Sequence, residues 1–287
     1  MIPIFLTRIE TQDRFPLEGV CIKNKKPGKV AIVWLHGLSS RFSSGQPLIK
    51  ELTSLCAKNN FGYFKFNLRG HDKVISGLKR KKFLGSAFER FEDCVLDIKA
   101  IIGFASRMGY KKIILAGHST GSNKALYYVY KTKDKRVKGL MLTSPISDVA
   151  VGGQEFGRAG IKRALALAKK LAKTNPLSLM PEKYGIYGAK RFLSLFEAGR
   201  SEDIFHYHDK NSKWKELRSI KIPVGVVFGS SEEYAPEGVE KLLKFFELNS
   251  RNSLKFSGHI IKNAGHGFKM HEKALSRVII KWIMSFL

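Results

Sequence analysis

A serine between two glycines stands where an expected strand gives way to an expected helix. Residues 111–128 read KKIILAGHSTGSNKALYY, which places Ser119 at the centre of a Gly-x-Ser-x-Gly pentapeptide. A side chain in such a sharp turn stands clear at the end of the strand, and the free N–H groups of the helix favour a developing negative charge there. The pattern predicts that Ser119 is a nucleophile. It also predicts that the flanking glycines are required, because a Cβ there would collide with the neighbouring strand and helix.

A serine hydroxyl needs a base within hydrogen-bond reach, and the base needs a carboxylate to orient it. His266 is the expected base, because it follows the last expected strand in the glycine-rich turn NAGHGF. His271, at the start of the last helix, is the rival candidate. The other six histidines lie in local turns, in an expected insertion or within a strand.

Three carboxylates compete to orient the histidine. Glu232 is the expected acid, since it stands three residues past Gly229 in the turn after an apolar strand. Asp148 is an alternative because it follows the preceding core strand, from which some hydrolases supply their acid. Glu233 is a second alternative, with a solvated turn or a helix cap as its ordinary interpretation. The residues alone leave all three open.

A tetrahedral intermediate needs two preorganised N–H donors. The amide of Thr120, directly after the nucleophile, is the first expected donor. The amide of Leu38 is the second, in the segment HGLSS that follows the apolar run of residues 30–35. A plain strand-to-helix turn is the alternative interpretation of that segment.

Strands alternating with helices predict an α/β fold with a doubly wound, mostly parallel sheet. Expected strands cover residues 4–9, 19–23, 30–35, 61–67, 113–116, 137–143, 223–228 and 254–261, and expected helices cover 47–57, 87–108, 237–248 and the C-terminal segment. The alternation of expected strands and helices is interrupted over residues 149–215. We therefore expect a helical cap at 149–215, inserted into a core of residues 1–148 and 216–287.

The expected cap carries more apolar side chains than a solvated loop would. They line an acyl pocket that selects the substrate, or they form only the cap's own small core. These residues are Phe156, Leu165, Leu167, Leu171, Leu177, Leu179, Met180, Phe192, Leu193, Leu195 and Phe196.

The charge is unusual, with 51 Lys and Arg against 24 Asp and Glu and a formal net charge of +27. Basic clusters occur at residues 23–29, 79–82, 131–138 and 162–173. They are scattered, and no aromatic-interleaved motif accompanies them. We expect solvated faces with weak association with polyanions or anionic membranes, and no specific nucleic-acid partner.

The three cysteines, Cys21, Cys56 and Cys94, are far apart and in no metal-type spacing, so we expect buried, reduced thiols. No secretory leader pattern is visible, and no apolar run reaches the roughly 20 residues of a membrane span. These features predict a cytoplasmic location. No metal or organic cofactor is implied, because no cluster of His, Cys and Asp shows ligand spacing.

Several motifs together resemble the α/β-hydrolase superfamily, over essentially the whole chain: WLHGLSS, NLRGH, GHSTGS, FGSSEEYAP and NAGHGF. NLRGH is similar to the lid-bearing branch of monoacylglycerol lipases, lysophospholipases and serine aminopeptidase-like esterases. SPISD, LMP and the Glu-Glu-Tyr turn are more similar still to a poorly characterised hydrolase family with no assigned substrate. The resemblance implies a nucleophile elbow, a catalytic triad and esterase-like chemistry. Glu in place of the usual Asp is the main departure.

These features predict a serine hydrolase, carboxylesterase-like or lipase-like, that cleaves a carboxylic ester or thioester through an acyl-enzyme on Ser119. Its expected partner is a small-molecule acyl substrate. Two alternatives stay open. One is an amidase or peptidase that uses the same residues, and the other is a non-catalytic protein that keeps the pocket to bind a small ligand.

Overall fold

The computed structural model describes residues 3–22, 28–76, 83–209, 211–235 and 237–287. The basic clusters at 23–29 and 79–82 therefore lie largely or wholly outside the described residues, as does Pro236 of the FGSSEEYAP motif.

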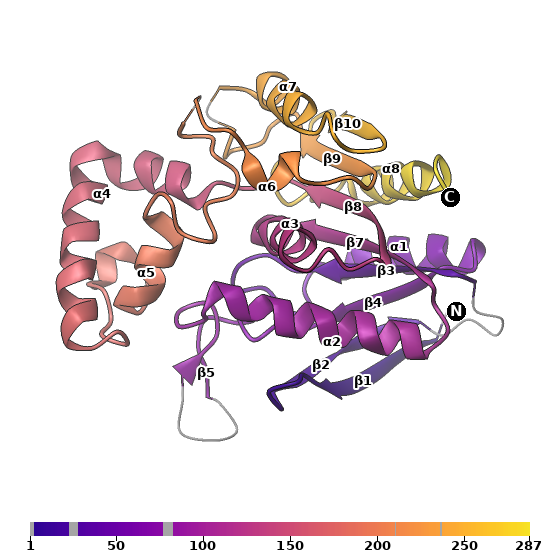
Figure 1. The fold of residues 1–287 in the computed structure, drawn as a ribbon, viewed down its shortest axis with the longest axis horizontal. Coiled ribbons are helices and arrows are strands. Elements are labelled where there is room, and N and C mark those ends of the chain that lie inside the picture. Colours follow the sequence, from indigo (N-terminus) through magenta and orange to yellow (C-terminus); the bar gives the residue numbers. More distant parts are fainter. Residues whose placement is uncertain (1–2, 23–27, 77–82, 210, 236) are drawn as a thin grey trace.

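An eight-stranded sheet runs through the molecule in the order β1-β2-β4-β3-β7-β8-β9-β10 (Figure 1). The strands β1, β2 and β4 pair antiparallel, and every neighbouring pair from β4 to β10 is parallel. This arrangement confirms the predicted doubly wound, mostly parallel sheet. The strands are β1 (Ile4–Glu10), β2 (Pro16–Ile22), β3 (Val30–Leu35), β4 (Gly62–Phe66), β7 (Lys112–His118), β8 (Val137–Thr143), β9 (Val224–Gly229) and β10 (Phe256–Ile261), and β5 (Ile75–Ser76) pairs with β6 (Phe83–Leu84) in a separate small sheet.

Helices cover both faces of the large sheet. On one face the core is shared with α2 (Cys94–Arg107), α3 (Thr120–Thr132) and α7 (Val239–Asn249). On the other face it is shared with α1 (Gln46–Lys58) and α8 (Glu272–Met284). Along β3, successive side chains alternate between the two cores, and all six are buried. A strand that is covered on both faces has an unbroken run of apolar residues, which is why the sequence predicted this strand.

The helix expected over residues 87–108 begins later, at Cys94, after a single 3-10 turn (Phe91–Asp93). Upstream of it, the N–H of Glu89 donates to the carbonyl of Gly85 at 2.8 Å. The Glu89 carboxylate then pairs with Lys124 of α3 at 2.7 Å. These contacts hold the segment in a turn, so tertiary structure overrides the apolar periodicity there.

The segment expected to be a cap divides into two parts. Its first part contains α4 (Asp148–Thr174), a 3-10 turn (Glu182–Tyr184) and α5 (Ala189–Phe196), and in Figure 1 α4 and α5 lie together away from the strands. A kink at Gly157, with φ 66° and ψ 163°, bends α4. The second part, with α6 (Lys215–Arg218), joins the main core through buried Ile204, Phe205 and Trp214. Only the first part, residues 148–202, is called the helical insert below.

The apolar side chains of the helical insert form a hydrophobic cluster of their own. Of the candidates for an acyl pocket, Leu177 and Leu179 stand exposed at 44% and 56%. Phe192 is fully buried and Phe196 is 6% exposed. The following candidates pack in or against the cluster: Phe156, Leu165, Leu167, Leu171, Met180, Phe192, Leu193, Leu195 and Phe196. Most of these side chains therefore build the core of the insert.

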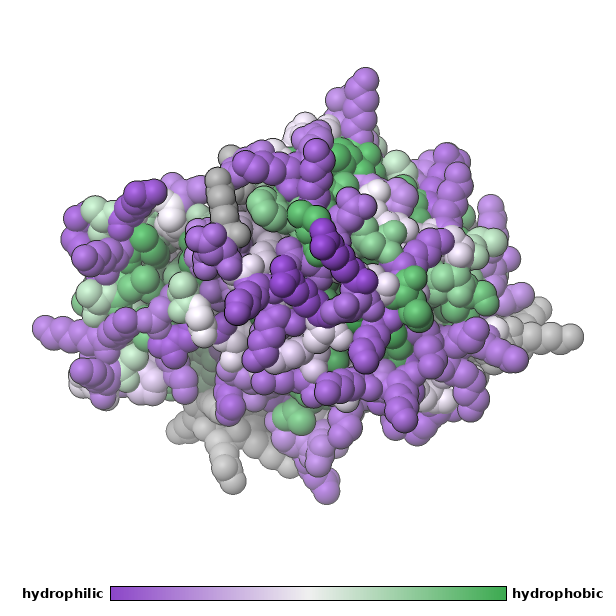
Figure 2. Space-filling view, turned by 45° about the horizontal axis from the view of Figure 1, so that its top comes forward, coloured by the Kyte–Doolittle hydropathy of each residue, from purple (hydrophilic) through white to green (hydrophobic). Residues whose placement is uncertain are grey.

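Hydrophilic side chains dominate the face drawn in Figure 2, and apolar residues show there as smaller patches between them. All three cysteines are buried, as predicted. Among the described residues, none of the helices combines the length and apolar character that crossing a bilayer requires.

Candidate active site

The turn between β7 and α3 holds Ser119 in an unusual backbone conformation. Its φ is 56° and its ψ is −129°, a backbone conformation that residues other than glycine rarely adopt. The N–H of Ser119 donates to the carbonyl of Thr143 at the end of β8, at 3.0 Å. The conformation is therefore maintained by the neighbouring strand.

Both glycines of the pentapeptide are required by close packing. A Cβ on Gly117 would lie 2.2 Å from the carbonyl oxygen of Gly121. A Cβ on Gly121 would lie 2.4 Å from the carbonyl oxygen of Leu35 in β3. The predicted collision with the neighbouring strand and helix is confirmed, and it explains why Ser119 can stand so close to both.

His266 and Glu232 form a hydrogen-bonded pair. The Nδ1 of His266 lies 2.6 Å from Oε1 of Glu232, whose side chain is 2% exposed. Burial works to raise the pKa of Glu232, but the hydrogen bond from His266 and the positive charge of that ring when protonated outweigh it, so the pKa is held below its ordinary value. An ionised carboxylate can only accept, so Nδ1 carries the proton, and in the neutral imidazole Nε2 is the nitrogen with a lone pair.

The loop that carries His266 is held from several sides. The backbone N–H of His266 donates to Oε2 of Glu233 at 2.7 Å, and Nε2–H of His118 donates to the carbonyl of His266 at 2.8 Å. The ring of Tyr234 meets the imidazole edge to face, with centroids 4.8 Å apart. Because His118 precedes Ser119 in the chain, these contacts place the histidine loop against the turn that holds Ser119.

The turns after β9 and β10 are joined through their backbones. The N–H of Ser231 donates to the carbonyl of Ala264 at 2.9 Å, and the N–H of Asn263 donates to Oγ of Ser230 at 2.8 Å. A Cβ on Gly229 would lie 2.1 Å from the carbonyl oxygen of Ala264. This close approach fixes the separation of Glu232 and His266.

The loop after β3 lies directly against Ser119. A Cβ on Gly37 would lie 3.1 Å from Cβ and 3.6 Å from Oγ of Ser119, so the amide of Leu38 follows a residue that borders Ser119. His36 braces this loop, accepting from the N–H of Leu68 at 3.1 Å and donating from Nδ1 to the carbonyl of Gly37 at 2.9 Å. Burial lowers the pKa of His36 to about 3, so it is neutral and can do both.

The two expected oxyanion donors differ in how they are placed. Thr120 is the first residue of α3, so its N–H is one of those left without an intrahelical acceptor at a helix start. Leu38 lies in a loop, and its side chain packs against the hydrophobic cluster of the helical insert. The insert therefore contacts one of the expected donor residues.

The alternative site residues lie elsewhere or have other contacts. Asp148 starts α4, and burial together with the charge of Glu202 raises its pKa well above the ordinary value. Glu233 binds the backbone of His266 rather than its ring. His271 is hydrogen-bonded through Nδ1 to the carbonyl of Lys269 in an exposed position. Of the candidate acids, Glu232 is the one that the structure brings to the ring of His266.

Two groups of polar residues were not singled out by the sequence analysis. In the first, Glu89, Lys124, Arg191 and Glu202 form a buried ionic cluster that joins α5 to α3. No short-range spacing reveals such a cluster, because its members are far apart in the chain.

The second group is Asp203, His206 and His208, whose ligand atoms lie within 4.8 Å of one another. Its spacing, Asp-x-x-His-x-His, is a possible metal-ligand pattern in the sequence, and the expectation that no cluster has ligand spacing did not take it into account.

Comparisons with known proteins agree with the fold described above. Residues 76–287 match the family described as "Protein of unknown function (DUF1749)". No curated protein sequence matches the chain.

Among solved structures, a siderophore hydrolase, EstB, from Aspergillus fumigatus is similar with a TM-score of 0.71 and 16% identity, covering 100% of this chain and 99% of that one. The esterase Pf2001 from Pyrococcus furiosus is similar with a TM-score of 0.66 and 18% identity, over 99% and 91% of the two chains. A carboxylesterase, CesB, from Bacillus subtilis has a TM-score of 0.60 at 16% identity, over 100% and 93%.

At these identities the solved structures establish the fold, and the family match covers most of the chain. The protein has the α/β-hydrolase fold and belongs to the DUF1749 family.

Proposed function

We propose that this protein is a serine hydrolase that cleaves a carboxylic ester or thioester through an acyl-enzyme on Ser119. The observation that carries the proposal is the buried, ionised Glu232 bound to Nδ1 of His266 at 2.6 Å, in a loop that contacts the nucleophile turn. A carboxylate in that position fixes the tautomer in which Nε2 can accept the proton of a serine hydroxyl.

In the proposed reaction, the hydroxyl of Ser119 transfers its proton to Nε2 of His266 while Oγ attacks the carbonyl carbon. The amides of Leu38 and Thr120 bind the oxyanion of the tetrahedral intermediate. The intermediate collapses as His266 returns the proton to the departing alcohol or thiol. Water then repeats the sequence on the acyl-enzyme and releases the acid, and throughout Glu232 stabilises the imidazolium.

The class of substrate is proposed from the chemistry of this site and from its neighbours. An esterase, a carboxylesterase and a siderophore hydrolase share the fold, which supports hydrolysis of an acyl bond here. The helical insert packs on Leu38, so its position influences both the donor loop and access to it. We propose a small-molecule acyl substrate and a cap role for the insert.

A fluorophosphonate probe tests the proposal directly, because it reacts covalently with an activated serine. We expect one equivalent of label, on the peptide that contains Ser119, and hydrolysis of p-nitrophenyl esters by the same preparation. The Ser119→Ala variant should neither label nor hydrolyse. A folded wild-type protein that does neither would instead be a non-catalytic binding protein, and turnover of amides in preference to esters would favour an amidase or peptidase.

A further inference from the structure

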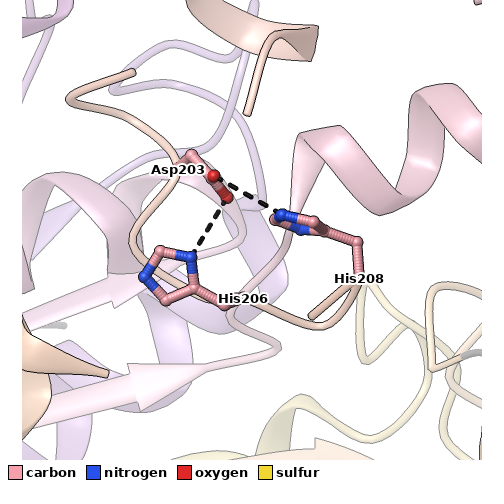
Figure 3. Close-up of side chains that lie close together, drawn as sticks. All are labelled: Asp203, His206 and His208. Atoms are coloured by element: carbon pink, nitrogen blue, oxygen red, sulfur yellow. Dashed lines mark ion pairs between the residues drawn. The ribbon is translucent and has the colours of Figure 1, made fainter. Parts of the chain in front are cut away.

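The loop of residues 203–208 brings one carboxylate and two imidazoles together (Figure 3). Nδ1 of His206 lies 3.7 Å from Oδ1 of Asp203, and Nε2 of His208 lies 3.7 Å from Oδ2 of the same carboxylate. In Figure 3 each ring turns a nitrogen toward the carboxylate. Three potential ligand atoms thus lie within 4.8 Å of one another.

The carboxylate of Asp203 is buried and incompletely satisfied. Its side chain is 2% exposed, and Oδ2 accepts from the N–H of Gly199 at 2.9 Å. Oδ1 has no hydrogen-bond partner among the described residues, since the 3.7 Å to Nδ1 of His206 exceeds hydrogen-bond length. A buried carboxylate oxygen without a partner is costly, and a bound cation would remove that cost.

The separations suit two ligands of one metal ion better than a hydrogen bond. Ligand atoms bound at 2.0–2.2 Å in tetrahedral geometry lie about 3.4 Å apart. The present 3.7 Å contacts, which end on different oxygens of the carboxylate, are about 0.3 Å longer than that value. Because the carboxylate is already oriented by the amide of Gly199, it has the outer-shell support that metal ligands usually have.

The residues between the ligands anchor the loop in the main core. Ile204 is 2% exposed and Phe205 is fully buried. The ring of Tyr207 stacks on Trp214 with centroids 6.1 Å apart, and its hydroxyl donates to the carbonyl of Pro145 at 2.5 Å. The ligands therefore project from a rigid backbone, which is a requirement for a selective site.

The local charge also favours a cation, in contrast to the strongly basic chain. Besides Asp203, the carboxylates of Glu216 and Asp209 also act electrostatically on His206. Such negative charges stabilise a bound metal ion.

We propose that Asp203, His206 and His208 form a binding site for a divalent transition metal ion of the zinc class. Two imidazole nitrogens and one carboxylate are a typical three-ligand set for such ions, and water would complete the coordination. Because Asp203 follows Glu202, which pairs with Arg191 of α5, a bound ion would tie the end of the helical insert to the main core. The site is independent of the hydrolase proposal, since neither its ligands nor its test involves Ser119.

Isothermal titration of the chelator-treated full-length protein with ZnCl2 tests the site. We expect one equivalent of Zn²⁺ to bind with a Kd in the micromolar range or below, and a saturating concentration to raise Tm by several degrees. Co²⁺ should give the intense visible absorption of a low-coordinate site with nitrogen ligands. Absence of stoichiometric binding in the wild-type protein would overturn the proposal.

Three variants localise the binding. Asp203→Asn keeps the shape and the acceptor for Gly199 but removes the charge, and the double variant His206→Ala/His208→Ala removes both imidazoles. Each should weaken Zn²⁺ binding at least ~10-fold, because a ligand is lost. His271→Ala, at a partly buried histidine outside this loop, is the matched control and should bind as the wild type does. Equal affinity in a folded Asp203→Asn variant and in the wild type would show that the three residues form only Asp–His ion pairs.

Discussion

The loops around Ser119 and the helical insert are held to the same sheet by different forces. The loops are fixed by backbone contacts: Gly117, Gly121 and Gly229 sit where a Cβ would come within 2.4 Å of a carbonyl oxygen. The insert is joined mainly through side chains, by the buried ionic cluster around Arg191 and by a hydrophobic cluster that reaches Leu38, although the N–H of Gly188 also donates to the carbonyl of Ala87 at 2.8 Å. A site fixed by the backbone tolerates little change, whereas a side-chain interface can be altered without moving the nucleophile.

The two kinds of attachment also differ in how much buried charge they involve. Backbone contacts at the carboxyl edge of the sheet add few buried charges. The ionic cluster, in contrast, buries Glu89, Lys124, Arg191 and Glu202, each with a side chain at most 2% exposed. Buried ions are costly to desolvate, so such a cluster stabilises the interface only while every member is present. We therefore expect changes in the loops to affect chemistry and changes in the cluster to affect docking of the insert.

The largest expected effect is at the nucleophile. Ser119→Ala should lower kcat for ester hydrolysis by ~10⁴-fold or more, because the acyl-enzyme can no longer form. The melting temperature should stay close to that of the wild type, since the packing of Gly117 and Gly121 is untouched. A variant that keeps a tenth of the wild-type turnover would exclude Ser119 as the nucleophile.

The second prediction separates the three candidate acids. Glu232→Gln should lower kcat by ~10²–10⁴-fold, because an amide does not stabilise the imidazolium. Glu233→Gln should have a smaller effect, since it changes the acceptor for the backbone N–H of His266 only. Asp148→Asn is expected to be milder than Glu232→Gln, and the reverse order in steady-state kinetics would move the acid to the end of β8.

The third prediction concerns the side-chain interface. Arg191→Met leaves Glu202 buried without its cationic partner and Glu89 with Lys124 alone, which should cost about 3–5 kcal/mol in the free energy of unfolding. Urea unfolding would measure the loss, and limited proteolysis would show whether the helical insert is released. Lys190→Met, at the exposed neighbouring position, is the matched control. Equal stability of the two variants would mean that the ionic cluster does not hold the insert.

The fourth prediction concerns how much His118, which joins the Ser119 turn to the His266 loop, contributes to the free energy of unfolding at different pH values. Burial lowers the pKa of His118 to about 4, below its ordinary 6.5, so the unfolded chain binds more protons as pH falls from about 6.5 to 4. The free energy of unfolding should therefore fall in that window, and His118 should contribute about 2 kcal/mol of the loss between pH 7 and 5.

The variant His118→Gln keeps a donor for the carbonyl of His266 but does not titrate, so its stability should decline less steeply with acid. Parallel curves for His118→Gln and the wild type in denaturant titrations at each pH would contradict the assignment.

The smallest expected effect is on substrate preference. Phe192 and Phe196 lie in the core of the helical insert, so replacing them with Ala should loosen the insert and shift the ratio of kcat/KM between long and short esters by ~10-fold. Leu179→Ala, at a side chain 56% exposed, is the control for truncation on the insert surface. Unchanged preference in folded Phe192→Ala and Phe196→Ala variants would argue against selection by the insert.

The sequence by itself determined the features that depend on neighbouring residues. Runs buried on both faces identified the strands, and the spacing Gly-x-Ser-x-Gly identified the turn at Ser119, because the collisions that demand glycine come from adjacent elements. The same local reasoning misplaced the start of α2, where contacts of Glu89 with residues distant in the chain prevail over apolar periodicity.

Only the tertiary structure decided which carboxylate meets His266 and how the insert is attached. Glu232, Glu233 and Asp148 were all compatible with the chain order, and the backbone contacts between the turns after β9 and β10 bring Glu232 to the ring. The burial of Phe192 and Phe196, the ionic cluster around Arg191 and the convergence of His206 and His208 on Asp203 likewise depend on how the loops and helices pack. Such choices follow from distances across the fold, which spacing along a chain does not encode.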